Sequence, residues 1–446
     1  MESTQPESAG PRGGRLGWVW SFLPINVGVA GFNTLVPLYI LALGGDVVQV
    51  SLFTTLYNAV LIPASIFWGR ATDRLKRRRI FFVIASAGTT AVFAAMFLLP
   101  NLGDLAALYA ALGLVVTANA VAANLLVMET SRKNDWISSY STLYLMVNLG
   151  SIVGVSVGIL WTSALPLGAF LVFCAAATCA SVVLSYRLVS EPGRTPEAGR
   201  PPPVARSLPS RLRHGAALLA RRIAASERTA VDAIRAVRAA RAGAMTGSVL
   251  LFFSAFLFTT GSAFFNTPFV PFLVRSGLVD DQVFAVSLIN TVAATLVYRW
   301  MGGFAKWFGG EKVGLYVIVA RTVLCLVLAA AAALLVSGSA MFLLAMAFYA
   351  LMGLTYAVWN SSTSVALLAS LGRARQGSLI GLYAALGALG TVAGSLFTGY
   401  VAYYLGYQTT FVVAAAVMLL SAYVLKAALR SLGRTEVGPD HEPASR

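Results

Sequence analysis

Nine asparagines lie inside long apolar runs of this chain, where polar side chains are otherwise scarce. An amide can donate and accept hydrogen bonds but does no acid–base chemistry, so these residues can bind a polar group or join two helices. Both uses stay open at this stage. The asparagines are Asn26, Asn33, Asn58, Asn119, Asn124, Asn148, Asn266, Asn290 and Asn360.

Groups that titrate near neutral pH are absent from the middle of these runs. The two histidines, His214 and His441, fall in polar segments, and no Asp or Glu occupies a central position. Cys174, Cys179 and Cys325 all fall within apolar runs, which favours packing over a disulfide framework or a metal site. We therefore expect no metal, no cofactor and no enzymatic activity.

Composition places the chain in a lipid bilayer. Of its 446 residues 58% are hydrophobic and only 11% are charged, with a mean hydropathy of +0.77. A soluble domain carries roughly 25% charged residues. Lipid satisfies no backbone polar group, so the runs are expected to be helices, and the fold class is an all-α membrane protein with twelve transmembrane helices. The runs cover approximately residues 18–43, 47–68, 80–99, 105–128, 137–160, 165–189, 246–274, 282–301, 313–336, 340–368, 378–404 and 407–429.

The net charge of +16 follows the topology of these runs. Basic residues gather in alternate loops, as the positive-inside rule requires of a protein with both termini in the cytoplasm. We expect a multi-pass protein of the cytoplasmic membrane with both termini cytoplasmic. Its bases then contact anionic headgroups of the inner leaflet, and nucleic acid is not a partner.

The two halves of the chain repeat each other. FNT is followed by a proline at 32–37 and again at 265–271, so that Asn33 matches Asn266 and Gln49 matches Gln282. LGSIVG at 149–154 likewise matches LGTVAG at 389–394. Such repeats are common in transporters, with the substrate site between them. The repeat predicts two pseudo-symmetric six-helix halves. The predicted segments are a cytoplasmic tail (1–17), a first half (18–189), a basic linker with an amphipathic helix (190–245), a second half (246–430) and a second tail (431–446).

Pro37 and Pro271 are the repeated prolines, near the predicted outer ends of the first helix of each half. A proline inside a helix removes a backbone hydrogen bond and bends the axis. Two bent helices facing each other make an outer gate, while a bend needed only for packing is the alternative.

Residues 69–79 read GRATDRLKRRR, between the second and third runs, and resemble the signature loop of the major facilitator superfamily. Gly69, Asp73, Arg74, Arg77 and Arg78 match that pattern, while Lys76 replaces its second glycine. We expect a cytoplasmic latch in which Gly69 lets two helices approach and the acid pairs with bases. Topological anchoring alone is the alternative. Arg70, Glu129 and Glu191 are candidate members of the same charge cluster.

The resemblance implies that the first, fourth, seventh and tenth helices line a central cavity. It therefore selects Asn33, Asn119, Asn124, Asn266 and Asn360 as cavity residues, with Tyr57, Tyr144, Trp359 and Tyr383 as aromatic wall residues. Gly150, Gly154 and Gly158 resemble the fifth-helix glycine motif of exporters without its proline. These three glycines, with Gly390 and Gly394, are expected to pack helices closely. Arg321, about 12 Å into a peripheral helix, is expected to snorkel to the inner surface.

These features predict a secondary transporter of a small-molecule substrate working by alternating access, as a monomer. Export of an amphipathic compound is the favoured direction. Uptake of a polar neutral solute is the alternative, and a non-transporting sensor or lipid-handling protein on the same scaffold is a second class. Proton coupling is left open, and would run through Glu129, Asp46 or Asp281 near the surfaces.

Overall fold

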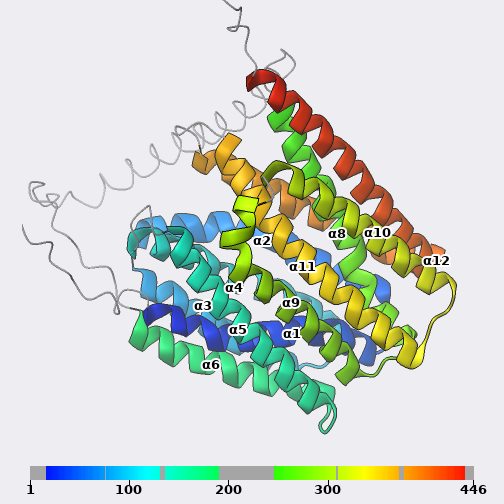
Figure 1. Cartoon of the computed structure of the whole chain (residues 1–446). Coiled ribbons are helices and arrows are strands. Elements are labelled where there is room, and N and C mark those ends of the chain that lie inside the picture. Colours follow the sequence, from blue (N-terminus) through cyan, green and yellow to red (C-terminus); the bar gives the residue numbers. More distant parts are fainter. Residues whose placement is uncertain are drawn as a thin grey trace, which may run out of the picture. The chain divides into compact units, whose positions relative to one another are not determined.

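The structure, a computed structural model, describes residues 17–75, 77–130, 136–189, 246–307, 310–370 and 376–436 (Figure 1). In these ranges every regular element is helical, as the bilayer argument predicts. The residues outside these ranges include the predicted amphipathic helix of the linker, Lys76, residues 1–16 and residues 437–446. The start of the predicted tail 431–446 is described as helix up to Glu436.

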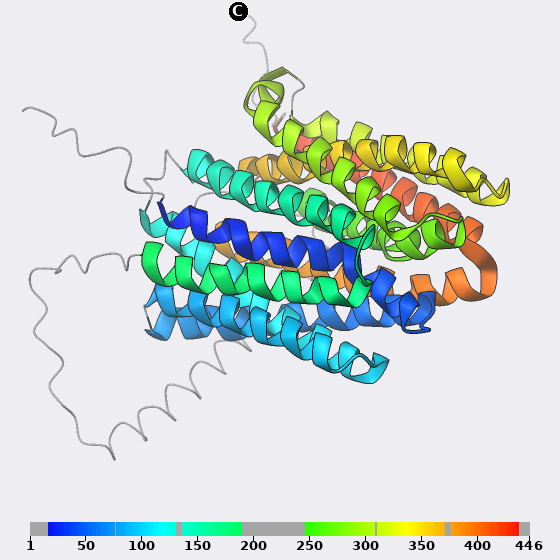
Figure 2. The same ribbon diagram turned by 90° about the horizontal axis from the view of Figure 1, so that it is seen from below.

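In its described residues, the first half of the chain forms six α-helices and two short 3-10 helices. They are η1 (Gly17–Ser21), α1 (Phe22–Ala42), α2 (Val47–Leu75), α3 (Arg78–Leu98), α4 (Leu102–Thr130), α5 (Trp136–Thr162), η3 (Leu167–Ala169) and α6 (Phe170–Leu188). Helix α1 packs against both α5 and α6, and α3 and α4 pack against each other (Figure 2).

The second half holds α8 (Thr246–Arg275), α9 (Asp280–Trp307), α10 (Gly310–Ala333), α11 (Gly338–Ser370) and α12 (Gln376–Glu436). Gly406 interrupts α12 with φ 85° and ψ 164°, a backbone conformation that suits glycine. This residue falls between the predicted runs 378–404 and 407–429. Among the described residues ten helices are long and apolar enough to cross a membrane, and α9 is not one of them. The count of twelve spans therefore stays a prediction.

The chain divides into two compact units. The first comprises Met1–Pro192 with Ser254–Tyr423, and the second comprises Gly193–Phe253 with Val424–Arg446. The described part of the second unit is the start of α8 and the end of α12. The contacts between helices of the two halves lie within the first unit.

The two repeated glutamines begin equivalent helices in the same way. The backbone N–H of Asp46 donates to Gln49 Oε1 over 3.1 Å, and Gln49 N–H donates back to Asp46 Oδ1 over 2.9 Å. At the start of α9, Val279 N–H donates to Gln282 Oε1 over 3.3 Å. Each glutamine thus satisfies a backbone donor three residues earlier, which explains its recurrence in both halves.

Glycines bring α5 against α1 without room for a side chain. A Cβ at Gly150 would lie 2.5 Å from the carbonyl oxygen of Leu23, and one at Gly154 would overlap the carbonyl of Val27. Substitution at either position would therefore push the two helices apart.

The same arrangement recurs between α12 and α8. A Cβ at Gly390 would lie 2.5 Å from the carbonyl oxygen of Phe256, and one at Gly394 would overlap the carbonyl of Thr260. Phe256 and Thr260 stand in α8 where Leu23 and Val27 stand in α1, at the spacing that relates Asn33 to Asn266. The sequence repeat therefore corresponds to a repeated helix contact.

Candidate functional site

Asn33 and Asn266 are exposed residues within otherwise buried stretches. Every other residue of Gly31–Ile40 is buried, and so is every other residue of Gly261–Phe269. Helices α1 and α8 also have the largest buried shares of the ten candidate spans, 67% and 61%. Neither amide makes a hydrogen bond to any described residue. In the described structure each half therefore presents an exposed amide without a hydrogen bond, set in an otherwise buried stretch of helix.

Prolines free a backbone carbonyl near each amide, and the freed carbonyl in α8 is already bonded. Pro37 has no N–H, so it cannot donate to the carbonyl of Asn33, four residues earlier. In α8, Pro268 frees the carbonyl of Phe264 in the same way, and the hydroxyl of Thr398 donates to that carbonyl over 3.0 Å. Asn33 lies nine residues before the end of α1, about 14 Å along the axis, which is near the middle of a bilayer roughly 30 Å thick.

The other predicted cavity residues have mixed positions. Tyr57 stacks on Tyr109 with ring centroids 4.7 Å apart. Tyr144 on α5 is 49% exposed, and Trp359 is 4% exposed. Asn119 is buried, and Asn124 is exposed but already has an interaction within the protein. The side chains of Asn360 and Tyr383 lie outside the described part of the structure.

Four of the nine asparagines join backbone groups instead. Asn26, Asn58 and Asn148 each donate to the carbonyl four residues earlier in their own helix, over 2.7–2.8 Å. Asn290 on α9 donates to the carbonyl of Tyr349 on α11 over 2.8 Å. These amides are engaged in the fold, which separates them from Asn33 and Asn266.

The two halves meet through a serine that the sequence reasoning missed. The hydroxyl of Ser51 on α2 donates to the carbonyl of Ser395 on α12 and accepts from Gly399 N–H over 3.0 Å. Thr55 adds a hydrogen bond of 2.9 Å to the hydroxyl of Ser395. Ser51 and Ser395 are both fully buried. We call these four residues the α2–α12 junction. No charge, motif or repeat marks them in the sequence.

A second contact between the halves joins α5 to α9. The ring of Phe284 lies where a Cβ at Gly158 would be, and it packs edge-on against Phe170 with centroids 5.5 Å apart. Gly158 is near the end of α5 and Phe284 near the start of α9. This contact and the α2–α12 junction both lie toward the predicted outer end of their helices.

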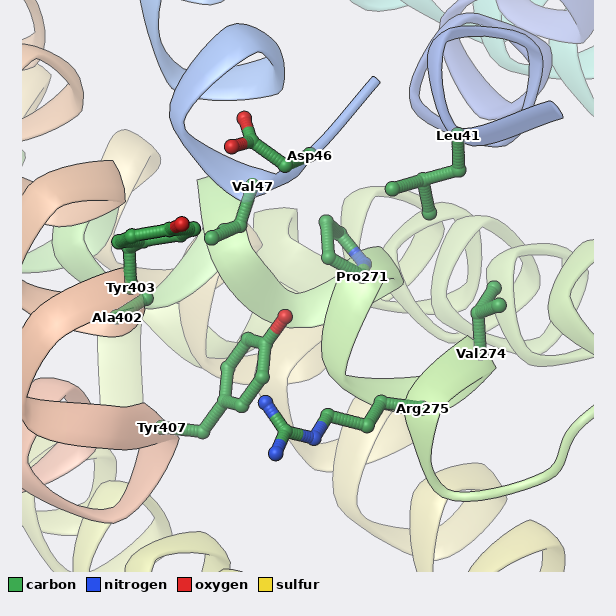
Figure 3. A pocket seen from close by; sticks show the side chains of 9 residues that line it. All are labelled: Leu41, Asp46, Val47, Pro271, Val274, Arg275, Ala402, Tyr403 and Tyr407. Atoms are coloured by element: carbon green, nitrogen blue, oxygen red, sulfur yellow. The ribbon is translucent and has the colours of Figure 1, made fainter. Parts of the chain in front are cut away.

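A pocket of about 350 Å³ opens beside the junction (Figure 3). Asp46 and Val47 line it from the first half, and Pro271, Arg275 and Tyr407 line it from the second. The guanidinium of Arg275 lies 5.7 Å from the ring centroid of Tyr407. Pro271 thus lies where the two halves face each other, whereas Pro37 does not line this pocket.

The acids near this end already have structural roles. Asp46 caps α2, and Asp281 accepts the N–H of Gln282 over 2.8 Å. Burial raises the pKa of the neighbouring Asp280 carboxyl, and the negative charge of Asp281 raises it further. Asp46 and Asp281 therefore each accept a backbone N–H at the start of a helix.

The signature loop is partly described. Arg70, Arg74 and Arg77 are exposed, while Arg78 is buried and its Nη1 donates to the carbonyl of Thr72 over 2.7 Å. The side chains of Asp73 and Glu129, and the whole of Glu191, lie outside the described part. Within that part nothing lies within 4 Å of a Cβ built on Gly69. The close helix approach expected at Gly69 is therefore not found there.

Arg79 is a further residue that the sequence reasoning missed. Its Nε donates to the carbonyl of Val189 over 2.7 Å, and its guanidinium lies 5.3 Å from the ring centroid of Tyr186. The last base of the cluster thus ties the start of α3 to the end of α6.

The expectation that Arg321 snorkels to the surface is wrong. The residue is 2% exposed, near the middle of α10, and its Nη1 donates to the carbonyl of Met352 over 3.0 Å. A helical position alone does not tell which way a long side chain points. Here it points from α10 toward α8 and α11.

Comparison with known proteins places these features in a family. The family model described as Major Facilitator Superfamily matches residues 20–325. No curated protein matches the chain.

Several solved structures share the fold. The nucleoside transporter NupG has a TM-score of 0.63 at 16% identity, with 94% of this chain and 99% of that chain covered. A bacterial homologue of the human lysosomal transporter Spinster, inward-facing and unoccupied, has 0.67 at 12%, with 96% and 100% covered. The human organic anion transporter MFSD10 has 0.59 at 16%, with 93% and 100% covered. At such identities these likenesses concern the fold alone. The match over most of the chain confirms the resemblance carried by the GRATDRLKRRR loop, and this multi-pass membrane protein belongs to the Major Facilitator Superfamily.

Proposed function

We propose that this protein is a secondary transporter that carries a small molecule across the cytoplasmic membrane by alternating access. In this proposal twelve spans form two six-helix halves, Gly406 separates the last two spans, and both termini are cytoplasmic. The protein acts as a monomer, without a cofactor and without enzymatic activity.

The observation that carries the proposal is the pair of unused amides, Asn33 and Asn266. An amide without a partner is costly in lipid but not in water. Their exposure within interior helices, about half a bilayer deep, supports a hydrated space between the halves. Related transporters bind substrate there.

The contacts between the halves support one conformation of the transport cycle. The α2–α12 junction and the Gly158–Phe284 contact lie toward the predicted outer end, so they favour a conformation closed on that side. Opening outward then requires both contacts to separate, with the Arg70–Arg78 loop closing the other side as a latch.

We favour export of an amphipathic compound, because the incompletely buried rings of Tyr57 and Tyr144 add apolar surface for such a molecule. Uptake of a polar neutral solute is the second candidate, and the unused amides favour it. The structural neighbours include a nucleoside transporter and an organic anion transporter, and these substrates favour neither export nor uptake.

The test uses purified protein in proteoliposomes and cells with and without the transporter, loaded with fluorescent amphipathic compounds and with nucleosides. We expect the Asn33→Ala/Asn266→Ala double variant to lose transport. The control Asn26→Ala removes an amide from the same helix, where it bonds the carbonyl of Phe22, and should transport normally. Lower accumulation that an uncoupler abolishes supports energised export. Equal transport by the double variant and the wild type contradicts the proposal.

A further inference from the structure

Arg321 is a buried cation without an acidic partner in the described structure. It is 2% exposed, and both of its hydrogen bonds to described residues start from Nη1, to the carbonyl of Met352 over 3.0 Å and to Thr355 Oγ1 over 3.3 Å. Its Nε is buried and has no hydrogen-bond partner in the described structure. The ionisable groups facing it there are Cys325, Tyr349 and Tyr356, none of them a carboxylic acid.

This arrangement is costly for a residue that only joins two helices. Arginine carries five N–H donors and stays charged, and a charge in the middle of a span is normally paired. A neutral side chain could make the bond to Met352 without burying a charge. The unused Nε and the missing counter-charge therefore point to a partner that is absent from the described residues.

Aromatic rings surround the guanidinium. Its central carbon lies 5.4 Å from the ring centroid of Phe258 and 5.9 Å from that of Tyr356. Phe258 in turn stacks on Trp359 with centroids 4.0 Å apart. The site therefore combines one fixed positive charge with apolar, polarisable walls.

Tyr356 is the accessible ring beside Arg321. Phe258 is 1% exposed, whereas Tyr356 is 49% exposed, and its ring centroid lies 5.9 Å from the central carbon of the guanidinium. Rotation of the Tyr356 ring is therefore the movement that would open Arg321 to the accessible surface.

We propose that the transported substrate is an aromatic or otherwise apolar carboxylate, and that Arg321 binds its carboxylate once Tyr356 turns aside. This inference rests on the proposed transport function and names its substrate class. A carboxylate accepts two parallel hydrogen bonds from a guanidinium, which uses the Nε left unpaired here. The surrounding rings bind the apolar part of the same molecule.

The test compares matched probes in proteoliposomes: indole-3-acetate and 1-naphthoate, their primary amides, and tryptamine as a cation. The wild type should transport a carboxylate faster than its amide. Arg321→Gln should lower carboxylate transport about tenfold or more and leave amide transport unchanged, because a hydrogen bond to a charged group is lost. Arg321→Lys should retain part of the preference. Arg187→Gln, which removes an exposed arginine at the end of α6, should change nothing.

The outcomes separate the two proposals. Transport of amides or tryptamine alone, or an unchanged carboxylate preference in Arg321→Gln, overturns the substrate class and leaves the transport function standing. No transport of any probe counts against both. If Arg321→Gln does not fold, the substrate class is tested by the thermal unfolding temperatures of the wild type and of Tyr356→Ala with each probe. Carboxylates should stabilise both proteins more than amides do, and equal stabilisation overturns the inference.

Discussion

The α2–α12 junction predicts how far single substitutions shift the conformational equilibrium. Ser51→Ala removes two buried hydrogen bonds between the halves, to Ser395 and from Gly399. At a net value near 1 kcal/mol each or somewhat less, their loss destabilises the closed outer side by about 1–2 kcal/mol. That energy shifts the ratio of closed to open molecules by roughly 5- to 30-fold. Gly399→Ala acts in the same direction, because its Cβ would overlap Ser51 and lie 2.9 Å from the carbonyl oxygen of Val47.

The measurement is the distance between spin labels at two exposed loop positions, Asn101 of the first half and Ser337 of the second. Cys174, Cys179 and Cys325 are replaced beforehand. Both junction variants should enlarge the long-distance population. Thr54→Val is the control, since its hydroxyl bonds only Val50 within α2. If both junction variants fold and give the wild-type distance distribution, the junction does not hold the outer side closed.

Two stability predictions follow from the same geometry. Gly154→Ala should lower thermal stability in detergent by about 1–3 kcal/mol through overlap with the Val27 carbonyl, whereas Gly387→Ala, whose Cβ would meet only Thr259 at 3.7 Å, should not; equal melting temperatures would refute the packing argument. Folding raises the pKa of Asp280, so its charged form is penalised above that pKa and the penalty disappears as the pH falls through it. Asp280→Asn should therefore be more stable than wild type at pH 7, with a smaller stability gain on acidification; a larger gain would contradict this reading.

The family and the helical architecture could be predicted from the chain because they depend on composition and local pattern. Apolar runs, the 69–79 loop and the LGSIVG/LGTVAG repeat are properties of adjacent residues. Even the interruption of α12 at Gly406 falls between two predicted runs. These features need no knowledge of what the helices contact.

Side-chain direction could not be predicted in the same way. Gly69 and Gly154 look alike in sequence, yet one has open space around it in the described structure and the other touches a neighbouring backbone. A peripheral helix predicts that Arg321 reaches the membrane surface, but in the structure the side chain points inward. Ser51 carried no signal, since a serine in an apolar run is common and its partners lie in the other half.

Among the nine asparagines, the sequence could not separate the two roles that an amide has in a membrane. Asn58 and Asn290 follow the repeated glutamines by nine and eight residues, but one bonds its own helix and the other bonds α11. Only the hydrogen bonds distinguish them from the unpaired Asn33 and Asn266. Polar residue types in apolar runs thus identify candidates, and tertiary contacts decide among them.

The buried Arg321 also constrains how the chain enters the membrane during synthesis. Helix α10 is made before α11, which supplies the Met352 carbonyl, so the nascent span carries an arginine that this partner cannot yet bind. Such a residue at a helix centre opposes insertion by about 2.5–3.5 kcal/mol, and each Leu, Ile or Val favours it by about 0.3–0.6 kcal/mol. The α10 span has a mean hydropathy of 2.3, as high as any of the ten candidates. Its exposed Val323, Leu326 and Val327 therefore serve biosynthesis of the protein as well as its contact with lipid.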